Sequence, residues 1–195
     1  MITPGQPVTI NGLTQSGADP GHLRIVINGS KLGSAGEGIN LATHNSVIRG
    51  LVMNGFGDTA LALSGGGVGH NVVAGNYFGT DVTGTNVVAN QFDVLVISQL
   101  NTIGGYKPRD RNLLDGATYS AVDVTNYGNT VPGNYVGVDV TGTKPVPNNV
   151  GVELGGATLA QVGGSNRAPC SRSRSGSAPP ATAPTTGRGG HSSAP

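Results

Sequence analysis

The sequence predicts an all-β fold, a parallel β-helix, for residues 1–164 and a separate tail for residues 165–195. Two observations carry the fold prediction. A fifteen-residue segment recurs within the chain, and three families of short apolar segments follow one another in a fixed order. In addition, no window of ten or more residues shows the 3.6-residue period of a helix.

The recurring segment is Asn71–Thr85, which returns as Asn129–Thr143 with most positions identical. Both copies are rich in Gly, Asn and short apolar pairs. Internal repeats of this composition indicate stacked supersecondary units, each of which contacts mainly its neighbours along the stack.

Three families of strand-like segments can be laid in register. One alternates apolar and other residues: Ile39–Leu41, Leu61–Leu63, Leu95–Ile97, Val122–Val124 and Val152–Leu154. A second lies after or near Asn: Val47–Ile48, Val72–Val73, Thr102–Ile103, Thr130–Val131 and Gln161–Val162. A third comprises Gly50–Val52, Asn76–Phe78, Asn112–Leu114 and Asn134–Val136. Three short strands per unit predict a solenoid of about five to seven coils, each pairing with the next at about 4.8 Å.

The Asn residues are predicted to form the corners between strands. Asn tolerates left-handed backbone, and its amide can bond to the same amide in the next coil. We expect one such column at Asn45, Asn71, Asn101 and Asn129, and another at Asn76, Asn112 and Asn134.

Composition excludes several classes of protein. Gly is 34 of 195 residues, charged residues are 11 per cent, and the net charge is +1, which gives no electrostatic basis for a nucleic-acid partner. No apolar run is long enough for a membrane span, and no signal peptide is visible in the chain. A single Cys, Cys170, excludes an internal disulfide.

The segment 165–195 contains no Val, Ile, Leu, Met, Phe, Tyr or Trp. Such a segment cannot bury enough apolar surface to offset the entropy of ordering, so it is predicted to be disordered. We expect this tail to be a linker or to replace further repeats. The alternative is a mildly basic arm that contacts a cell wall or nucleic acid.

The repeat resembles right-handed parallel β-helix proteins of the pectin-lyase-like class. It is most similar to repeats of large secreted or surface bacterial proteins with the pattern Asn-x-Val/Ile-x-Gly-Asn-Tyr-Ile/Val-Gly-Thr-Asp-x-Thr-Gly-Thr. Asn71–Thr85 fits throughout, and Asn129–Thr143 departs at Val138. The resemblance implies a right-handed solenoid and an extracellular or cell-surface location. It implies little about activity, because the scaffold hosts lyases, hydrolases, adhesins and inert stalks.

Catalytic candidates come from the enzymes of that class, which use acidic calcium ligands with a basic residue, or paired Asp residues. Asp81 and Asp139 occupy equivalent repeat positions, predicted to lie about 10 Å apart across two coils. Arg111 is the candidate basic residue. The alternative for both Asp residues is a turn in which the carboxylate accepts local N–H groups, or a calcium ligand.

Binding candidates are the acidic residues near the alternating strands and one basic loop. Asp123 and Glu153 are central residues of equivalent triplets, and Asp93 precedes another, so an acidic stripe is expected on one sheet face. Lys107 and Arg109, beside Arg111, form the concentrated charge of the repeat region and could contact acidic sugars. In both cases the alternative is a plain solvated surface.

Two further sets of residues are candidates for a metal site and for sugar stacking. His44 and His70 precede equivalent strands and are weak candidates for a metal site, although two imidazoles without a third ligand seldom hold zinc. Tyr77, Phe78 and Tyr135 form either a sugar-stacking platform or part of the interior. No cofactor is expected, apart from calcium as a minor possibility.

The sequence favours a non-catalytic β-helix segment of a secreted or surface protein, acting as stalk, adhesin or matrix-binding module. A polysaccharide or cell-surface matrix is the partner that this predicts. The alternative is a carbohydrate-active enzyme, a polysaccharide lyase or glycoside hydrolase. Because the repeat breaks off after Gly164, end-to-end self-association is also expected.

Overall fold

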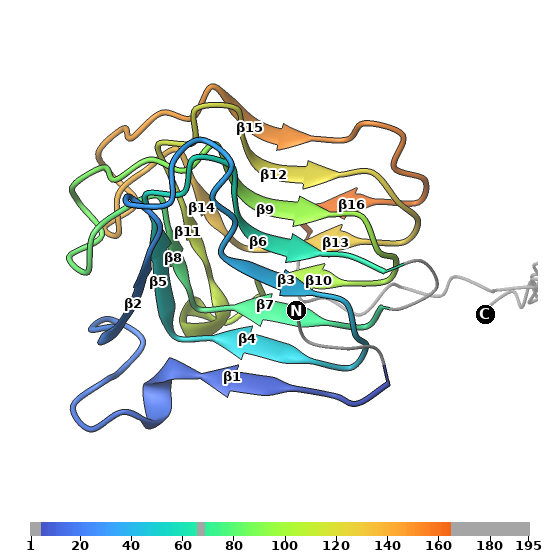
Figure 1. The fold of residues 1–195 in the computed structure, drawn as a ribbon, viewed down its shortest axis with the longest axis horizontal. Helices are drawn as coiled ribbons and strands as arrows, with labels where there is room; N and C mark the ends of the chain where they lie inside the picture. Colours follow the sequence, from blue (N-terminus) through green and yellow to red (C-terminus); the bar gives the residue numbers. More distant parts are fainter. Residues whose placement is uncertain (1–4, 66–68, 165–195) are drawn as a thin grey trace, which may run out of the picture.

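The computed structural model describes residues 5–65 and 69–164, so the predicted disorder of residues 165–195 lies outside the described residues. Within them the chain is almost entirely β-structure, with two short 3-10 turns, η1 (Gly12–Thr14) and η2 (Pro108–Asp110). The strands form three sheets in which every strand pairing is parallel (Figure 1).

The first sheet has six strands: β1 (Thr9–Asn11), β4 (Val47–Arg49), β7 (Val72–Ala74), β10 (Thr102–Ile103), β13 (Thr130–Val131) and β16 (Gln161–Val162). The second has five: β2 (Ile25–Asn28), β5 (Leu51–Asn54), β8 (Tyr77–Phe78), β11 (Leu113–Leu114) and β14 (Tyr135–Val136). The third also has five: β3 (Ile39–Leu41), β6 (Thr59–Leu63), β9 (Phe92–Val96), β12 (Ser120–Val124) and β15 (Val150–Glu153).

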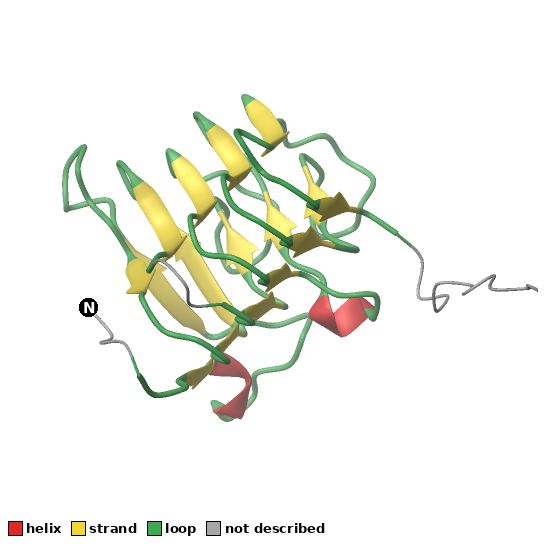
Figure 2. Cartoon of the chain, turned by 90° about the vertical axis from the view of Figure 1, so that its right-hand side faces the viewer, coloured by secondary structure: helices red, strands yellow, loops and turns green. Residues whose placement is uncertain are grey.

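In each sheet a strand pairs with the strand three places later in the chain. The chain therefore visits the first, second and third sheets in turn and then returns to the first beside its earlier strand. Figure 2 shows the strands stacked in rows, joined by loops at the corners. The topology is consistent with a parallel β-helix.

The strand families expected from the sequence are confirmed as sheets. The Asn-adjacent pairs become the first sheet, the Asn-Tyr-Phe family the second, and the alternating triplets the third. The strands β1 and β2 belong to none of the families, and the sequence comparison missed them.

The expected register of β9 is wrong by one residue. Val94, and not Leu95, lies opposite Leu61 and Val122, while Leu95 lies opposite Ala62 and Asp123. The segment Val94–Val96 is apolar at every position, so the alternation that normally fixes a register is missing there. Packing decides instead: Val94 and Val96 are fully buried, and Leu95 is only partly covered.

A single hydrophobic core runs between the sheets. It consists mostly of branched aliphatic side chains, each stacked on the equivalent side chain of the neighbouring strand, such as Ile48 on Val73 and Leu63 on Val96. Phe78 and Met53, which lie opposite each other on adjacent strands, are among its largest fully buried side chains. A smaller apolar cluster, Leu23, Val52, Tyr77 and Leu113, lies apart from this core, with Tyr135 packed against it.

Buried amide columns link successive strands at the corners. In the first, Asn71 Nδ2 donates to Asn101 Oδ1 at 2.9 Å, and Asn101 Nδ2 donates to Asn129 Oδ1 at 3.0 Å. A second column joins Asn76, Asn112 and Asn134 in the same way. The expected members of both columns are confirmed, except Asn45.

Asn45 does not join the first column because Ser46 occupies the equivalent position and donates its N–H to Asn71 Oδ1. Asn45 instead has left-handed backbone (φ 52°), as does His70 (φ 60°), which aligns with it before the next strand. At the corner before the first sheet, one residue has left-handed backbone, and the residue after it occupies the position of the amide column. Among the described residues, no helix is long and apolar enough to cross a membrane.

Candidate functional site

The two repeated aspartates each close a turn of their own. Asp139 Oδ1 accepts hydrogen bonds from Thr141 Oγ1 at 2.6 Å and from the N–H groups of Thr141, Thr143 and Lys144. Asp81 Oδ1 accepts from Thr83 in the same geometry, and its Oδ2 accepts from Asn86 Nδ2 at 2.8 Å. The Asp-x-Thr-Gly-Thr motif is therefore a carboxylate-closed turn in both copies.

These turns hold both carboxylates in the charged form. Partial burial alone would raise the pKa of Asp81, but the hydrogen bonds from Asn86 and Thr83 outweigh it and lower the pKa to about 2. For Asp139 the hydrogen bond from the Thr141 hydroxyl is the main cause of a lowered pKa. Asp139 is only 1% exposed, and burial opposes that lowering; the N–H groups of Thr141, Thr143 and Lys144 add to the effect of the hydroxyl and outweigh it.

The turns also contact each other. Val140 N donates to Gly84 O at 3.1 Å, and a side chain at Gly84 would collide with Val140. The two copies lie two strands apart in the second sheet, and they meet because the intervening connection after β11 is short. The glycine of the motif is thus required both for its left-handed backbone (φ 66°) and for this close approach.

Arg111, the candidate basic residue, belongs to a hollow of about 280 Å³ on the outer side of the second sheet. Its Nε donates to Gly133 O at 2.8 Å, and its guanidinium carbon lies 4.1 Å from the centre of the Tyr135 ring. The walls of the hollow are apolar and aromatic side chains together with the turn at residues 20–21: Pro20, Gly21, Tyr77, Pro108, Leu113, Tyr135 and Val140. Arg111 therefore lies near the Asp139 turn through Val140, while the Asp139 carboxylate is engaged by its own turn.

Tyr77, one of the residues that line this hollow, has a buried hydroxyl group. The residue is 5% exposed, and its hydroxyl has no hydrogen-bond partner among the described residues. Burial raises the pKa of Tyr77, and the negative charge of Asp19 raises it further, so the hydroxyl stays protonated. Of the three aromatic candidates, Phe78 is fully buried in the core, whereas Tyr77 and Tyr135 both line the hollow.

The expected acidic stripe contains two of its three members. Asp123 and Glu153 lie opposite each other on β12 and β15. Partial burial raises the pKa of Asp123, and the neighbouring charge of Glu153 raises it further. Asp93 does not share this face: it is fully buried and accepts a hydrogen bond from Asn90 Nδ2 at 2.8 Å.

Asp93 belongs instead to a buried carboxyl pair with Asp115, which the sequence did not single out. Burial raises the pKa of Asp93 well above its usual value against the opposing hydrogen bond from Asn90, and the charge of Asp115 adds to the rise. Burial also raises the pKa of Asp115 to about 7, although the N–H groups of Gly137 and Val138 lie near enough to oppose it. Neither N–H forms a well-aligned hydrogen bond, and both Asp115 oxygens lack a partner among the described residues.

The basic residues of the loop Lys107–Arg111 lie in different surroundings. Lys107 and Arg109 are exposed to solvent, and Arg109 Nε lies 4.0 Å from Asp110. Asp110 in turn pairs with Arg49 at 3.2 Å, which fixes the loop against the first sheet. Arg111 alone turns toward the hollow of the second sheet.

The two histidines do not form a metal site with other ligands. His70 aligns with Asn45 and not with His44, so the imidazoles are offset by one residue. His44 Nδ1 lies 2.9 Å from Asn45 Nδ2. In the described part of the chain, no three His, Cys, Asp or Glu side chains are grouped as metal ligands, for zinc or for calcium.

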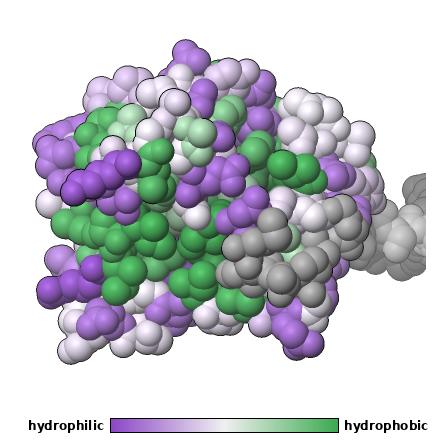
Figure 3. Space-filling model, in the orientation of Figure 1, coloured by the Kyte–Doolittle hydropathy of each residue, from purple (hydrophilic) through white to green (hydrophobic). Residues whose placement is uncertain are grey.

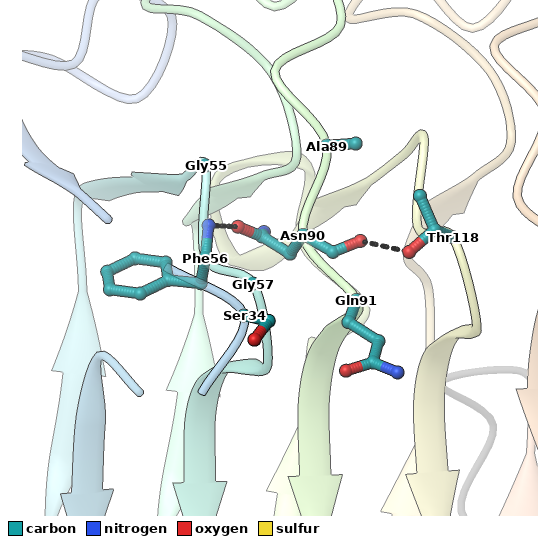
Figure 4. Close-up of a pocket in the computed structure, with 8 residues that line it drawn as sticks. All are labelled: Ser34, Gly55, Phe56, Gly57, Ala89, Asn90, Gln91 and Thr118. Atoms are coloured by element: carbon teal, nitrogen blue, oxygen red, sulfur yellow. Dashed lines mark hydrogen bonds between the residues drawn. The ribbon is translucent and has the colours of Figure 1, made fainter. Parts of the chain in front are cut away.

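A second, more open hollow of about 500 Å³ lies where the second sheet leads into the third (Figure 4). Asn90 stands at its centre, accepting from Phe56 N at 3.0 Å through its side chain and from Thr118 through its carbonyl. Beside it the rings of Phe92 and Tyr119 pack with centroids 4.7 Å apart. This aromatic pair could not be found from the sequence, because the two residues are 27 positions apart and belong to no repeated motif.

The chain matches no protein-family model, no curated protein and no solved structure at a significant level.

Proposed function

We propose that this chain is a non-catalytic segment of a right-handed parallel β-helix of about five to seven coils, from a secreted or cell-surface protein of the pectin-lyase-like class. Its role would be that of a stalk, adhesin or matrix-binding module that contacts polysaccharide. The three parallel sheets, each pairing every third strand, support the solenoid. The resemblance of the repeat supports the class and the location.

One observation carries the non-catalytic assignment: the carboxylates of Asp81 and Asp139 are each held by their own turn. Both oxygens of Asp81 accept hydrogen bonds, and Asp139 Oδ1 accepts four, while its covered Oδ2 has no partner among the described residues. Glycoside hydrolysis needs one carboxyl that gives a proton and another that accepts one or attacks. Both pKa values here are lowered, so neither group is suited to hold a proton for a leaving group near neutral pH. The carboxyl with a pKa of about 7, Asp115, is buried.

The surface supports a binding role. Figure 3 shows hydrophobic side chains gathered into a continuous area on one face, bordered by hydrophilic ones. Exposed aromatic rings such as Tyr106, Tyr119 and Tyr127 are spread over the loops. Aromatic faces beside polar groups are suited to stack on sugar rings, and loops over a rigid scaffold commonly carry such contacts.

The ends of the stack support self-association. Each sheet ends in strands that pair on one side only among the described residues: β1, β2 and β3 at one end and β14, β15 and β16 at the other. Beside the second end, Leu154, Leu159 and Val162 are exposed, with Leu159 75% exposed. Unpaired edges and exposed apolar side chains favour contact with a further repeat, so end-to-end association is part of the proposal.

The test is to incubate the purified chain with acidic and neutral polysaccharides, with and without calcium, and to measure both products and retention. We expect retention on an insoluble polysaccharide without release of unsaturated uronides or reducing ends. Turnover that disappears in Asp139→Asn or Arg111→Ala, but persists in the exposed variant Glu37→Gln, would establish the enzyme alternative instead.

A further inference from the structure

The two ends of the stack are open edges in the described part of the chain. The strands β1, β2 and β3 at the first end and β14, β15 and β16 at the last end each pair on one side only (Figure 1). The outermost layers of the core are also only half-buried there: Ile10, Ile25, Ile27 and Ile39 at the first end, and Val136 and Val152 at the last. Both ends therefore present free backbone groups together with apolar side chains, and a further layer of strands would cover both.

Two connections next to these ends bend back along the stack rather than over the edges. Between β2 and β3, Gly36 O accepts a hydrogen bond from Asp58 N at 3.2 Å, which ties the connection to the residues just before β6. After β14, Val140 N donates to Gly84 O at 3.1 Å, which ties that turn to the loop after β8. A partner stacked on either end therefore meets strand edges and core side chains, and not these connections.

The free backbone groups of the two ends are complementary. Successive residues of a strand direct their backbone groups to opposite neighbours. At the last end Gly137 N donates to β11, so the N–H and C=O of Val136, the residue before it, point outward. At the first end Gly29 N donates to β5, so the backbone groups of Val26 and Asn28 point outward. In a parallel pairing of β2 with β14, Val136 N donates to Val26 O, and Asn28 N donates to Val136 O.

The register of the sheets, carried one strand further, sets which side chains meet. If β2 of a second copy lies beside β14, its Ile27 falls opposite Val136. If β3 lies beside β15, its Ile39 falls opposite Val152, and its Asn40 falls opposite Glu153. The two apolar contacts bury half-buried side chains of both copies, and the third places an amide donor opposite a carboxylate. The first end thus fits the last end as one strand fits the next within the stack.

The unequal numbers of strands in the sheets set how closely a second copy can approach. The first sheet has six strands and the others five, so β16 extends one strand beyond β14 and β15. When β2 and β3 of the second copy pair with β14 and β15, its β1 falls on the place beside β13 that β16 occupies. Of the two, β16 is held more weakly, because its residues Gln161 and Val162 are both exposed, whereas β1 has three residues and packs Ile10 on the core. In that place Ile10 would cover Val131 in the position of Val162.

We propose that copies of this chain assemble head to tail into an open filament, in which β2 and β3 of one copy pair with β14 and β15 of the next and β1 replaces β16 beside β13. The inference rests on the end-to-end association in the proposed function and names its partner, polarity and register. Because the two contacting surfaces differ, each added copy presents a new free end, and a stack that grows along its own axis does not close. Each copy advances the stack by five strands, about 24 Å at the usual strand spacing, whereas placing β1 on β16 would need six strands, about 29 Å.

The test uses two variants of the full chain, each blocked at one end. Val26→Pro removes an N–H from the outer edge of β2, and Glu153→Pro removes one from the outer edge of β15, while the donors within the stack remain. Val26→Thr and Glu153→Gln, which keep these N–H groups, are the matched controls. In sedimentation, the parent and the controls should form filaments, and each proline variant alone should have a dissociation constant about tenfold or more above that of the parent. Mixed in equal amounts, the proline variants should form one-to-one dimers, because each keeps the end that the other lacks.

The strand exchange has its own test. Val162→Asp places a charge on β16 and weakens that strand, so release of β16 becomes easier and the dissociation constant should fall about two- to threefold. If association depended on Val162 as an exposed apolar contact, the same substitution would weaken it. Electron microscopy of the parent filaments should show an axial repeat of about 24 Å and not about 29 Å.

Mixed dimers of the proline variants, together with the shorter repeat, support the assembly. The inference is overturned if the proline variants associate as the parent does, if their mixture forms no dimer, if the repeat is the longer one, or if Val162→Asp weakens association. A parent chain that stays monomeric at every concentration would show that other parts of the chain cover the ends, and would also overturn it. A monomer that is still retained on polysaccharide would leave the binding role of the proposed function standing, whereas cleavage of the polysaccharide would refute that role without affecting the assembly.

Discussion

A buried amide column and a buried carboxyl pair in this chain follow opposite rules. At the corner before the first sheet, Asn71, Asn101 and Asn129 pass hydrogen bonds from one strand to the next. Between the second and third sheets, Asp93 of β9 and Asp115, which follows β11, are equally buried, yet three of their four carboxyl oxygens have no partner among the described residues.

The difference lies in the chemistry of the two side chains. An amide has both a donor and an acceptor, so identical residues on successive strands satisfy one another. An ionised carboxylate only accepts, and placing two of them near each other brings like charges together in a medium of low polarity. The amide column therefore stabilises the stack at every pH, whereas the carboxyl pair is tolerated only when it carries protons.

The largest effect is expected at the centre of the amide column. Asn101→Ala removes the acceptor for the N–H and the Nδ2 of Asn71, and also the donor to Asn129. The unpaired buried groups should lower the free energy of unfolding by about 2–4 kcal/mol. Urea unfolding followed by circular dichroism measures this loss.

Asn149→Ala is the matched control. Because Asn149 is exposed, this substitution should change the free energy of unfolding by less than about 0.5 kcal/mol. Asn101→Asp, protonated at low pH, keeps the acceptor but has one O–H donor in place of the two N–H donors that bond to Ser98 and Asn129, so its stability there should fall between that of the parent and that of Asn101→Ala. Equal stability of Asn101→Ala and Asn149→Ala would refute the role given to the column.

The carboxyl pair should make stability fall as the pH rises. The pKa of Asp115 is raised to about 7 and that of Asp93 is raised as well, so between about pH 4 and 7 the folded chain binds more protons than the unfolded chain. This stabilisation is complete below the unfolded pKa and is lost as the pH passes the folded pKa. Asp81, Asp139 and Asp19 have lowered pKa values and act oppositely, losing their stabilisation only in acid.

We therefore expect the urea midpoint to be highest near pH 5 and to decline toward pH 8. A midpoint that rises steadily from pH 5 to pH 8 would contradict the raised pKa values of the pair.

Asp115→Asn isolates the contribution of one carboxyl. At pH 8 it removes a buried charge and should stabilise the chain by roughly 1–3 kcal/mol once solvent screening is allowed for. At pH 5, where the parent side chain is already protonated, the gain should be much smaller. The measurement is the difference between the two unfolding free energies at each pH, with the exposed variant Glu37→Gln as control; a gain that is equal at both pH values would show that charge is not the cause.

The smallest effect is expected at the half-buried residues Asp123 and Glu153. These two carboxylates lie opposite each other on adjacent strands, and like charges in that position repel. Glu153→Lys should turn repulsion into attraction and stabilise the chain by about 0.5 kcal/mol, an effect that high salt would reduce. Comparison with Glu153→Gln separates the loss of repulsion from the new attraction, and no salt dependence in either variant would contradict the pairing.

The sequence predicted much of the fold but little of the site chemistry. Repeated Asn-Tyr-Phe and alternating apolar segments recur at similar spacing, and each family became one sheet. The turn alternative for Asp81 and Asp139 was also available from the motif, because the donors to each carboxylate lie within five residues of it. In the same way, the amide columns follow from Asn at equivalent positions.

By itself the sequence thus determined the strands after β2, their order and the local turns, since these depend on neighbours in the chain. Only the tertiary structure decided the register of Val94, the burial of Asp93 beside Asp115, and the meeting of Arg111 with Tyr77 and Tyr135. Each of these depends on which residues from different strands face one another, and therefore on connections of unequal length. A shift of one residue reverses which side chains are buried, and the repeat pattern alone does not resolve a shift that small.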